Sequence, residues 1–407
     1  MIHLLVCLGR AGWGEASMGI GIAEDLVGVG DSVRFLIHSS VSPLFANKGF
    51  EIDSIDDNTG GITDLLVQDL IESYRPDSII LCDFFTTCSY LRSVKIDAEF
   101  LMGLGVPIIA LDTWDFHETG FSIDMYFNDE KRVPNWIDRT PFRLIPSPIV
   151  RPVTRRGVYS CLPKSSAVDL KVRRHVRSNL GLLESDKAVL FCTAAWQQAD
   201  YDDEHARRLA GCLPSLISQY IKRSGSTVHL IHVGPNPYVI DDLLADRYHW
   251  LPQLKSGDFD LLLPSMDLQI SANLSARSIA RSIVSGVPTV VIQNSYFARD
   301  VAEARILNSG SVSAEFHRWL LNALPLYPFK LWPLGFHKFL SPMTRENSYC
   351  NAVKVAELFD EEQTISTISG ILFDPTKREE ILHSQLAYAH QVSELPGPAR
   401  TVREFLE

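Results

Sequence analysis

The sequence predicts an α/β fold made of two domains, each a doubly wound parallel sheet. Short apolar runs typical of buried strands alternate with segments that repeat apolar residues at helical spacing. This alternation favours parallel sheets covered by helices. The pattern occurs twice, and a chain of 407 residues is too long for one hydrophobic core. We therefore expect two domains of roughly 150 to 200 residues each.

The first unit of this pattern begins the chain. It combines a strand at 2–8, a glycine-rich turn from Gly9 to Gly14, a helix at 16–28 and a strand at 33–37. The helix repeats apolar residues near a 3.6-residue period, which gives it one face to lay on a sheet. Two further strands are expected in this domain, at 78–82 and 107–111.

A segment of different composition separates the two halves. Residues 142–166 are rich in Pro, Arg and Ser and lack clean periodicity, so we interpret them as the crossing between domains. We expect the first domain to cover 1–160 and the second to cover 161–376. The elements expected in the second domain are a helix at 168–180, a strand at 188–193, a helix at 204–223, strands at 228–233 and 268–271, a helix at 275–284 and a strand at 288–293.

Residues 315–350 are unusually rich in aromatic residues, Leu and Pro. The simpler interpretation is an insertion that packs on the second domain or forms a homodimer contact. The other is an apolar acceptor pocket or a membrane-surface contact, because exposed aromatic patches usually mark binding sites. The sequence leaves both open.

Composition and charge exclude several classes of function. The formal net charge of −11 argues against nonspecific nucleic-acid binding, which needs clustered Lys and Arg, and favours a small or neutral partner. No run reaches the eighteen or so apolar residues of a membrane helix. The first strand lacks the basic region and cleavage site of a signal peptide. The seven cysteines form no Cys-x-x-Cys pair, which predicts reduced thiols and a cytoplasmic protein.

Short motifs exclude other classes of site. The run Gly9, Gly12, Gly14 reverses the dinucleotide spacing and no acidic residue ends the second strand, so NAD binding is not expected. Neither a P-loop nor a Gly-x-Ser-x-Gly elbow occurs. The triplets Asp200-Tyr201-Asp202 and Asp258-Phe259-Asp260 match the acid-x-acid pattern of metal-dependent transferases. Because that pattern arises readily by chance, we assign no metal.

Three motifs in the second half carry a family resemblance. The stretch Trp250-Leu251-Pro252-Gln253 is followed by a polar turn at Asn273–Ser278, and Gly286-Val287-Pro288 then precedes an apolar strand. In this order the motifs resemble the nucleotide-sugar site of GT-B glycosyltransferases, in which two Rossmann-like domains face a cleft. Residues 1–36 resemble the first βαβ unit of the same enzymes. The chain is thus similar to a divergent relative of the UDP-glycosyltransferase family.

The resemblance implies a donor site on the second domain. Trp250 would stack on the nucleotide base, and Gln253 would hydrogen-bond the ribose. Ser278 matches the family's phosphate-binding serine, and a helix that begins near Ser275 would direct unpaired N–H groups at the diphosphate. The expected donor-binding residues are Thr193, Gly234, Trp250, Gln253, Asn273, Ser275, Ser278 and Arg281.

Several residues depart from the family pattern. Asn273 replaces its diphosphate-binding histidine, Ser275 replaces a glycine, and Arg281 replaces the glutamate that binds ribose. The Asp-Gln pair that reads sugar hydroxyls is absent near Phe297. Asn273 can still donate to phosphate, and Arg281 can pair with it bidentately. These changes argue against an ordinary UDP-glucose donor.

The resemblance places the catalytic base in the first domain. Gly14-Glu15 falls on the family's Gly-His pair, so Glu15 would take the acceptor's proton if burial or a nearby carboxylate raises its pKa. An ordinary first-turn glutamate stabilised by the helix dipole also explains the residue. Asp83 and Asp112 follow strands, where open α/β sheets place their ligands, and would orient the base or bind the acceptor.

The sequence therefore predicts a cytoplasmic biosynthetic glycosyltransferase that works without a metal or other cofactor. It would move a sugar from a UDP- or dTDP-linked donor to a small-molecule or natural-product acceptor. By analogy with the family, residues 377–407 would include a helix that returns toward the first domain. Two alternatives remain: a sugar-nucleotide 2-epimerase, which would convert UDP-GlcNAc without an acceptor, and an auxiliary protein that binds nucleotide without turnover.

Overall fold

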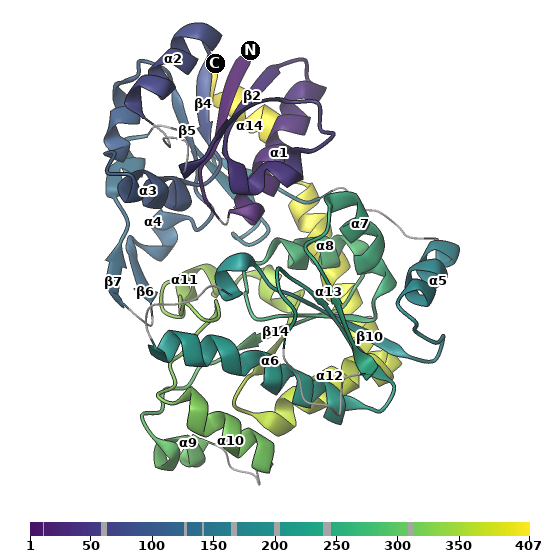
Figure 1. Cartoon of the computed structure of the whole chain (residues 1–407). Helices are drawn as coiled ribbons and strands as arrows, with labels where there is room; N and C mark the ends of the chain where they lie inside the picture. Colours follow the sequence, from purple (N-terminus) through teal and green to yellow (C-terminus); the bar gives the residue numbers. More distant parts are fainter. Residues whose placement is uncertain are drawn as a thin grey trace. The chain divides into compact units, whose positions relative to one another are not determined.

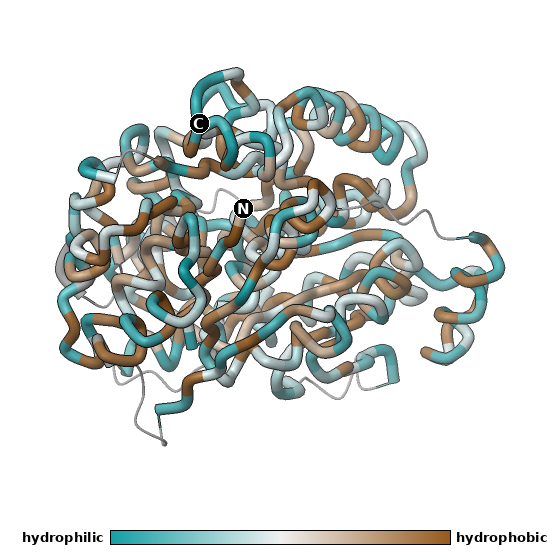
Figure 2. The backbone as a smooth tube through the Cα atoms, turned by 90° about the horizontal axis from the view of Figure 1, so that it is seen from above, coloured by the Kyte–Doolittle hydropathy of each residue, from teal (hydrophilic) through white to brown (hydrophobic). Residues whose placement is uncertain are grey.

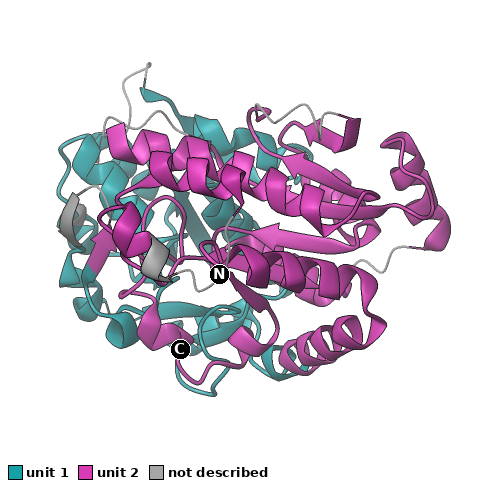
Figure 3. Cartoon of the chain, turned by 90° about the horizontal axis from the view of Figure 1, so that it is seen from below, with its two compact units in different colours: residues 1–122, 132–162, 390–407 teal, residues 123–131, 163–389 magenta. Residues whose placement is uncertain are grey.

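The chain divides into two compact units (Figure 3). The computed structural model describes residues 1–10, 12–57, 63–125, 128–140, 142–163, 169–198, 204–238, 246–307 and 313–407. Unit 1 comprises Met1–Ser122, Arg132–Leu162 and His390–Glu407, and unit 2 comprises Ile123–Lys131 and Pro163–Ala389. The chain passes from unit 1 into the main part of unit 2 at Leu162/Pro163, close to the predicted domain boundary at 160/161. It returns to unit 1 at Ala389/His390, within the final segment that was predicted to begin at residue 377.

Unit 1 is built on a seven-stranded sheet with the order β3-β2-β1-β4-β5-β8-β9. Neighbouring strands are parallel throughout. The order reverses direction between β1 and β4, which is the doubly wound topology. The strands are β1 (Ile2–Cys7), β2 (Ser32–His38), β3 (Glu51–Ile55), β4 (Ser78–Leu81), β5 (Ile108–Leu111), β8 (Phe142–Ser147) and β9 (Val158–Ser160).

The helices of unit 1 include the last residues of the chain. Helix α1 (Trp13–Gly28) lays Ile20, Ala23 and Leu26 on the sheet. Helix α14 (Pro398–Leu406) adds Ala399, Val402 and Phe405 to the same core and lies beside α1 (Figure 1). The other helices are α2 (Asp64–Tyr74), α3 (Phe84–Ser93) and the single turn α4 (Phe116–Thr119).

Unit 2 repeats this topology in a six-stranded parallel sheet with the order β12-β11-β10-β13-β14-β15. The reversal lies between β10 and β13. The strands are β10 (Lys187–Cys192), β11 (Val228–Val233), β12 (Tyr248–Leu251), β13 (Leu268–Ser271), β14 (Thr289–Gln293) and β15 (Lys354–Glu357). Two such sheets confirm the predicted fold class.

Helices surround the second sheet. They are α5 (Leu170–Asn179), α6 (Glu204–Ser224), α7 (Ser256–Leu262), α8 (Arg277–Ser285), α9 (Val301–Leu307), α10 (Ala314–Ala323), α11 (Ser341–Thr344), α12 (Glu361–Phe373) and α13 (Pro375–Ser393). A hairpin of β6 (Ser122–Met125) and β7 (Asn128–Arg132) contributes its central residues to this unit. Along the chain, hydrophobic colour follows the strands, whereas surface helices alternate in colour as amphipathic segments do (Figure 2).

The segment 142–166 contains the crossing between the units, at Leu162/Pro163, and also regular structure that its sequence did not predict. β8 and β9 lie within it and complete the first sheet. β8 escaped the periodicity because Arg143 interrupts its apolar run in order to pair with Asp112. β9 has only three residues, and residues 164–168 lie outside the described part of the chain.

The aromatic segment 315–350 packs into the core of unit 2. Trp319, Phe329 and Trp332 are at most 5% exposed and contact the same cluster as the sheet. These buried rings pack on the second domain, as the simpler interpretation proposed. The homodimer contact, the acceptor pocket and the membrane-surface contact stay predictions. Within the described residues, no helix is long and apolar enough to cross a membrane.

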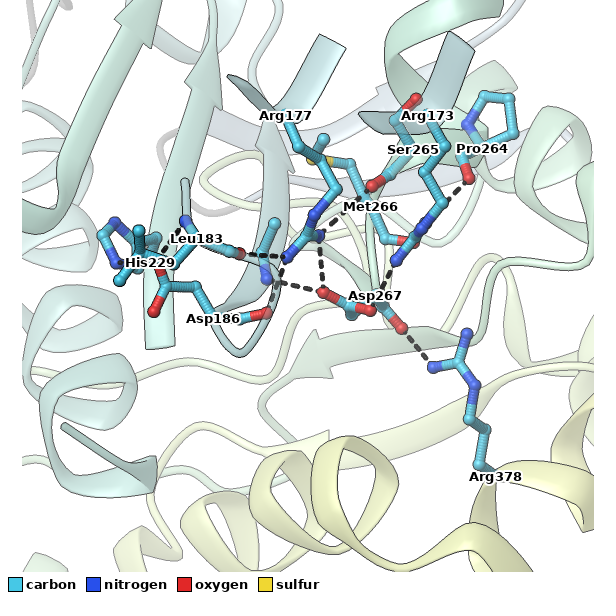
Figure 4. Close-up of polar contacts among 11 residues, drawn as sticks. Arg173, Arg177, Leu183, Asp186, His229, Pro264, Ser265, Met266, Asp267 and Arg378 are labelled. Carbon is cyan, nitrogen blue, oxygen red and sulfur yellow. Dashed lines mark hydrogen bonds and ion pairs between the residues drawn. The ribbon is translucent and has the colours of Figure 1, made fainter. Parts of the chain in front are cut away.

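A buried ion network closes the amino edge of the second sheet (Figure 4). Asp267, just before β13, pairs with Arg173 at 2.8 Å and with Arg177 at 2.9 Å, and it accepts from the Ala188 N–H at 2.8 Å. Arg378 of α13 donates to the Asp267 carbonyl oxygen at 2.5 Å. The network therefore ties α5, β10 and α13 to one end of β13.

Candidate functional site

In unit 1 the loops after β1 and β4 form the switch point, where open α/β sheets bind their ligands. The loop after β1 leads into α1, whose third residue is Glu15, and Asp83 follows β4. A Cβ on Gly12 would lie 3.3 Å from Glu15 Oε2 and 3.2 Å from the Gly9 carbonyl oxygen. Glycine is therefore needed here so that the loop can turn tightly beside the carboxylate.

Glu15 and Asp83 are electrostatically coupled. Burial raises the pKa of Glu15. Burial, and then the charge of Glu15, raises the pKa of Asp83 well above its usual range. Among the described residues, no cationic side chain forms an ion pair with either carboxylate. Asp83 Oδ1 accepts from the Phe85 N–H at 2.9 Å and thereby caps α3. Asp83 is thus fixed in place, and the raised pKa values of both acids favour their protonated forms.

Two thiols line the floor beneath these acids. Cys7 and Cys82 are buried on the neighbouring strands β1 and β4. A Cβ on Gly19 would lie 2.7 Å from Cys82 Sγ and 3.2 Å from Cys7 Sγ, so α1 approaches the sheet closely here. Burial raises the pKa of Cys7 well above its usual range, which keeps this thiol neutral. The resulting apolar floor favours the protonated form of the acids above it.

Asp112 is separate from this pair. It is 0% exposed, and both its oxygens lie 3.1 Å from the Phe116 N–H. Burial, and then Asp115, raises its pKa to about 7, although Arg143 at 3.2 Å opposes the shift. The structure therefore brings two of the three predicted acids together and gives Asp112 partners of its own.

A polar cluster at the end of β2 was missed by the sequence reasoning. Asp57 pairs with Arg10 Nε at 2.7 Å and His38 Nε2 at 3.2 Å, and it accepts from Tyr90 OH at 3.2 Å. The cluster anchors Arg10, and with it the loop that leads to Glu15. Its members come from four separate segments, so their spacing in the sequence gives no signal. His38, the polar residue that ends β2, is the one member of the cluster that the sequence pattern could have indicated.

In unit 2 the switch point lies between β10 and β13, where α8 begins. Ala276, the residue before α8, offers no side chain to cap the helix. The first N–H groups of a helix need partners, and its positive end attracts anions. Arg277 adds a positive charge in the first turn, where no acidic residue lies. An anion at this end would offset both charges.

The residues before α8 shape this end. Asn273 Oδ1 accepts from the Ser275 N–H at 2.9 Å and from Ser275 Oγ at 2.8 Å, which forms a turn. The helix therefore begins at Arg277 rather than at the predicted 275. Ser278 Oγ accepts from Gln269 Nε2 at 2.5 Å, so its own proton remains to be donated to another acceptor.

Arg281 does not have the open position expected for a phosphate-binding residue. Its guanidinium donates to Asp260 at 3.0 Å and to Ser256 Oγ at 2.9 Å, and it lies 5.5 Å from the ring centre of Phe259. These contacts join α8 to α7. Because its donors are directed toward α7, the predicted bidentate pairing with phosphate is not built into this arrangement.

Within the described residues, the triplet Asp258-Phe259-Asp260 gathers no group of metal ligands. Asp260 is occupied by Arg281. No group of three or more potential ligand side chains assembles within the ranges that the structure describes. Asp200-Tyr201-Asp202 lies outside those ranges.

Thr193 and Gly234 meet over a buried histidine. A Cβ on Gly234 would lie 2.3 Å from Thr193 Oγ1, so only glycine fits. His232 hydrogen-bonds Thr193 Oγ1 and Tyr248 OH, each at 2.8 Å, and the Tyr238 ring stacks on it at 4.3 Å. Burial lowers the pKa of His232 to about 4, so the ring is neutral. The sequence did not identify His232 and its tyrosines as part of this site.

Trp250 lies on the edge strand β12 with its ring 37% exposed. Its Nε1 donates to the Gly234 carbonyl oxygen at 3.1 Å, which fixes the ring's orientation. Gln253 is exposed in the loop that follows. An oriented, accessible indole at the carboxyl edge is a suitable surface for a flat ring system to stack on.

Comparisons with known proteins agree with this architecture. Residues 22–407 match the model of a family of unknown function (DUF6365). The chain belongs to this family. No curated protein matches its sequence.

Solved structures show the same fold at low sequence identity. The spinosyn forosaminyltransferase SpnP is 15% identical with a TM-score of 0.54, and the match covers 100% of both chains. The glycosyltransferase VinC in complex with dTDP is 11% identical with a TM-score of 0.52, over 100% of this chain and 98% of VinC. Anabaena Alr3699/HepE in complex with UDP and glucose is 12% identical with a TM-score of 0.54, over 99% and 98%. The chain thus has the predicted GT-B fold in a divergent form.

Proposed function

We propose that the protein is a glycosyltransferase that moves a sugar from a nucleoside-diphosphate sugar to a hydroxyl group of a small acceptor. The observation that carries this proposal is the Glu15–Asp83 pair at the switch point of unit 1. Burial raises the pKa values of both acids and no described cation opposes this, which is the direction of shift that a carboxylate general base needs. Glu15 is the base in this scheme, and Asp83 tunes and orients it.

Unit 2 would hold the donor. The nucleotide base of the donor stacks on Trp250, and its diphosphate lies at the amino end of α8, where the Ser278 hydroxyl donates a hydrogen bond to it. The bond between the anomeric carbon and the diphosphate oxygen breaks as the acceptor oxygen bonds that carbon, and the acceptor proton passes to Glu15. The helix end and Arg277 stabilise the departing charge, so this scheme does not require a metal.

The identity of the donor nucleotide and the cellular location of the protein are proposed from separate observations. VinC was solved with dTDP and Alr3699/HepE with UDP and glucose, so we extend UDP- or dTDP-linked donors to this chain. All seven cysteines are free thiols, which supports a role in cytoplasmic biosynthesis.

A second candidate is a binding protein that does not catalyse turnover. Two of the departures from the family pattern favour it. Asn273 Oδ1 and the Arg281 guanidinium are both engaged by neighbouring side chains. The protein would then still bind the nucleotide, but Asn273 and Arg281 would not help to break the bond between the sugar and the diphosphate.

A thermal-shift panel of nucleotides and nucleotide sugars, followed by product analysis, tests the proposal. If a ligand binds only the native state and its free concentration is 100 times its Kd, the native state is stabilised by about 2.7 kcal/mol. A shift of this size is readily measured. We expect UDP or dTDP to raise the Tm and a matching donor to be consumed when acceptors are added. If no nucleotide shifts the Tm, the donor site is misplaced. Binding without transfer or hydrolysis would establish the auxiliary role, and conversion of UDP-GlcNAc alone would establish an epimerase.

A further inference from the structure

The carboxyl edge of unit 2 extends beyond the proposed nucleotide site. In the order of the sheet, Trp250 lies one residue before the end of β12, α8 begins after β13, and β14 and β15 follow. From β12 to β13 there are three strand spacings, about 14 Å at ~4.8 Å each. An extended nucleoside diphosphate with its base at Trp250 and its phosphates at α8 therefore directs its distal substituent toward β14 and β15. This step rests on the proposed function.

A segment of the aromatic region crosses that part of the edge. Leu331 pairs in antiparallel fashion with Asn273, and Phe329 pairs with Asn294. The Leu274 N–H donates to the Lys330 carbonyl oxygen at 3.0 Å. The segment thus lies directly beside the turn that leads into α8. It brings Lys330 to the ends of β13 and β14.

Lys330 is a buried cation with only neutral hydrogen-bond partners. Its side chain is 8% exposed, and its Nζ donates to Ser341 Oγ at 3.0 Å and to Thr344 Oγ1 at 3.1 Å. No carboxylate in the described ranges forms an ion pair with it. An ammonium group has three donors, so one remains for a ligand oxygen.

His337 lies next to this lysine. Ser341 Oγ, which accepts from Lys330, donates to the His337 carbonyl oxygen at 2.6 Å. The ring is half-buried and forms no hydrogen bond within the described part of the chain. Burial, and then the charge of Lys330, lowers the pKa of His337, although Asp124 and Glu357 oppose this shift. A neutral imidazole offers one donor and one acceptor.

Glu357 completes the cluster from the end of β15. In the register of the sheet it lies opposite Gln293, whose Nε2 donates to Glu357 Oε1 at 2.7 Å. Ser295 donates to the same carboxylate through its Oγ at 2.7 Å and its N–H at 2.8 Å. These bonds fix the carboxylate and leave it acceptor capacity.

We propose that Lys330, His337 and Glu357 form the sugar-binding part of the donor site. Together they offer an ammonium donor, an imidazole that both donates and accepts, and a carboxylate acceptor, which suits vicinal hydroxyl groups. Two carboxylates, Asp124 and Glu357, act on this cluster against the single positive charge of Lys330, so the ligand is a neutral hydroxylated sugar rather than an acidic one. The cluster takes the place of the Asp-Gln pair that is absent near Phe297.

Calorimetric titration of the full chain with UDP, UDP-glucose, dTDP and dTDP-glucose tests this assignment. The informative quantity is the ratio of the Kd of the nucleoside diphosphate to the Kd of its sugar conjugate. We expect His337→Gln and Glu357→Gln each to lower this ratio by about 3- to 10-fold, the value of one or two hydrogen bonds. The Kd of the nucleoside diphosphate itself should not change.

Matched variants control for general effects on the fold. His317→Gln changes another half-buried histidine of the aromatic segment, on α10, and Glu362→Gln changes an exposed acid on α12. Both should keep the wild-type ratio. If wild type and the His337 and Glu357 variants share one ratio, the sugar assignment is wrong while the nucleotide site stands. If neither UDP nor dTDP binds the wild-type chain, the proposed function fails and this inference fails with it.

Discussion

Buried acids at the two edges of the sheets behave in opposite ways. At the amino edges, Asp31 before β2 and Asp267 before β13 are 6% and 8% exposed, and both have lowered pKa values. At the carboxyl edges, Asp83 and Asp112 are 3% and 0% exposed, and both have raised pKa values. Burial is similar, so burial alone does not explain the difference.

The difference lies in the cations that surround each carboxylate. Asp31 binds the amino terminus of the chain and Arg403, each at 2.9 Å, and Asp267 is bound by two arginines. Among the described residues, Asp83 has no such partner, and Asp112 has a single arginine, Arg143 at 3.2 Å, which the neighbouring charge of Asp115 opposes. Acids that are paired with cations hold the fold together, whereas acids left uncompensated at a ligand-binding edge are suited to move protons. Four predictions test this contrast.

The largest effect is expected from removing the uncompensated acid. Glu15→Gln keeps the size of the side chain but removes the proton acceptor, so turnover of the donor and acceptor identified by the panel should fall about 10²- to 10⁴-fold. The thermal shift by nucleotide should persist. Glu24→Gln on the same helix, which loses only a pair with Lys48, is the control. Equal rates for wild type and Glu15→Gln would remove Glu15 from the mechanism.

At the amino edge, breaking a pair should cost stability rather than activity. Arg177→Ala leaves Asp267 with one fewer partner in a buried network, and we expect a loss of about 3 to 5 kcal/mol in the free energy of unfolding. Arg174→Ala on the same helix breaks only the exposed pair with Glu184 and should cost less than about 1 kcal/mol. Denaturant titration of both variants measures the contrast, and similar losses would contradict it.

Stability should depend on pH in opposite directions at the two edges. The pKa of Asp112 is about 7 in the folded chain against an ordinary 3.8, so between these values only the folded chain keeps the proton. Unfolding free energy should therefore fall by about 2 to 4 kcal/mol as pH rises from 4 to 8. The pKa of Asp31 is about 2, so its stabilisation is present above pH 3.8 and is lost as pH falls toward 2.

Denaturant titrations at several pH values check both slopes. Asp112→Asn should flatten the profile between pH 4 and 8 and leave the acid limb unchanged. A variant that keeps the wild-type slope in the neutral range would show that Asp112 is already ionised in the folded chain.

The smallest of the four effects concerns the base-stacking surface. Trp250→Ala removes an oriented indole and should weaken nucleotide binding by about 1 to 3 kcal/mol, the usual value of stacking a base on an aromatic ring. Because the ring is 37% exposed, the unfolding free energy should change little. Calorimetric titration with UDP or dTDP measures the affinity. Trp13→Ala in unit 1 provides a tryptophan control outside the proposed donor site.

The central strands could be predicted because they are continuous apolar runs. β11 and β13 begin and end where the sequence placed them, since buried parallel strands carry apolar residues on both faces. β8 and β9 could not be predicted in this way, because Arg143 and the short length of β9 break the pattern. Their place in the sheet depends on pairing with β5, which is a long-range contact.

The residues of the candidate site likewise fall into those that a local motif predicts and those that depend on long-range contacts. Trp250 and Glu15 could be predicted from the sequence because they lie in motifs whose spacing is local, and their roles stay predictions. Asp57 and Glu357 were not found, because each meets its partners only where strands distant in sequence end side by side. Arg281 was given a phosphate-binding role because the sequence alone could not reveal that Asp260 occupies it.

The sequence by itself determined the two doubly wound sheets and the order of the loops at their carboxyl edges, because hydrophobic periodicity and turn residues act over a few neighbouring positions. Only the tertiary structure decided which buried acids have a cationic partner and where the aromatic segment crosses the second sheet. Charge pairing depends on distances between residues far apart in the chain, such as Asp31 and Arg403. No local pattern encodes those distances.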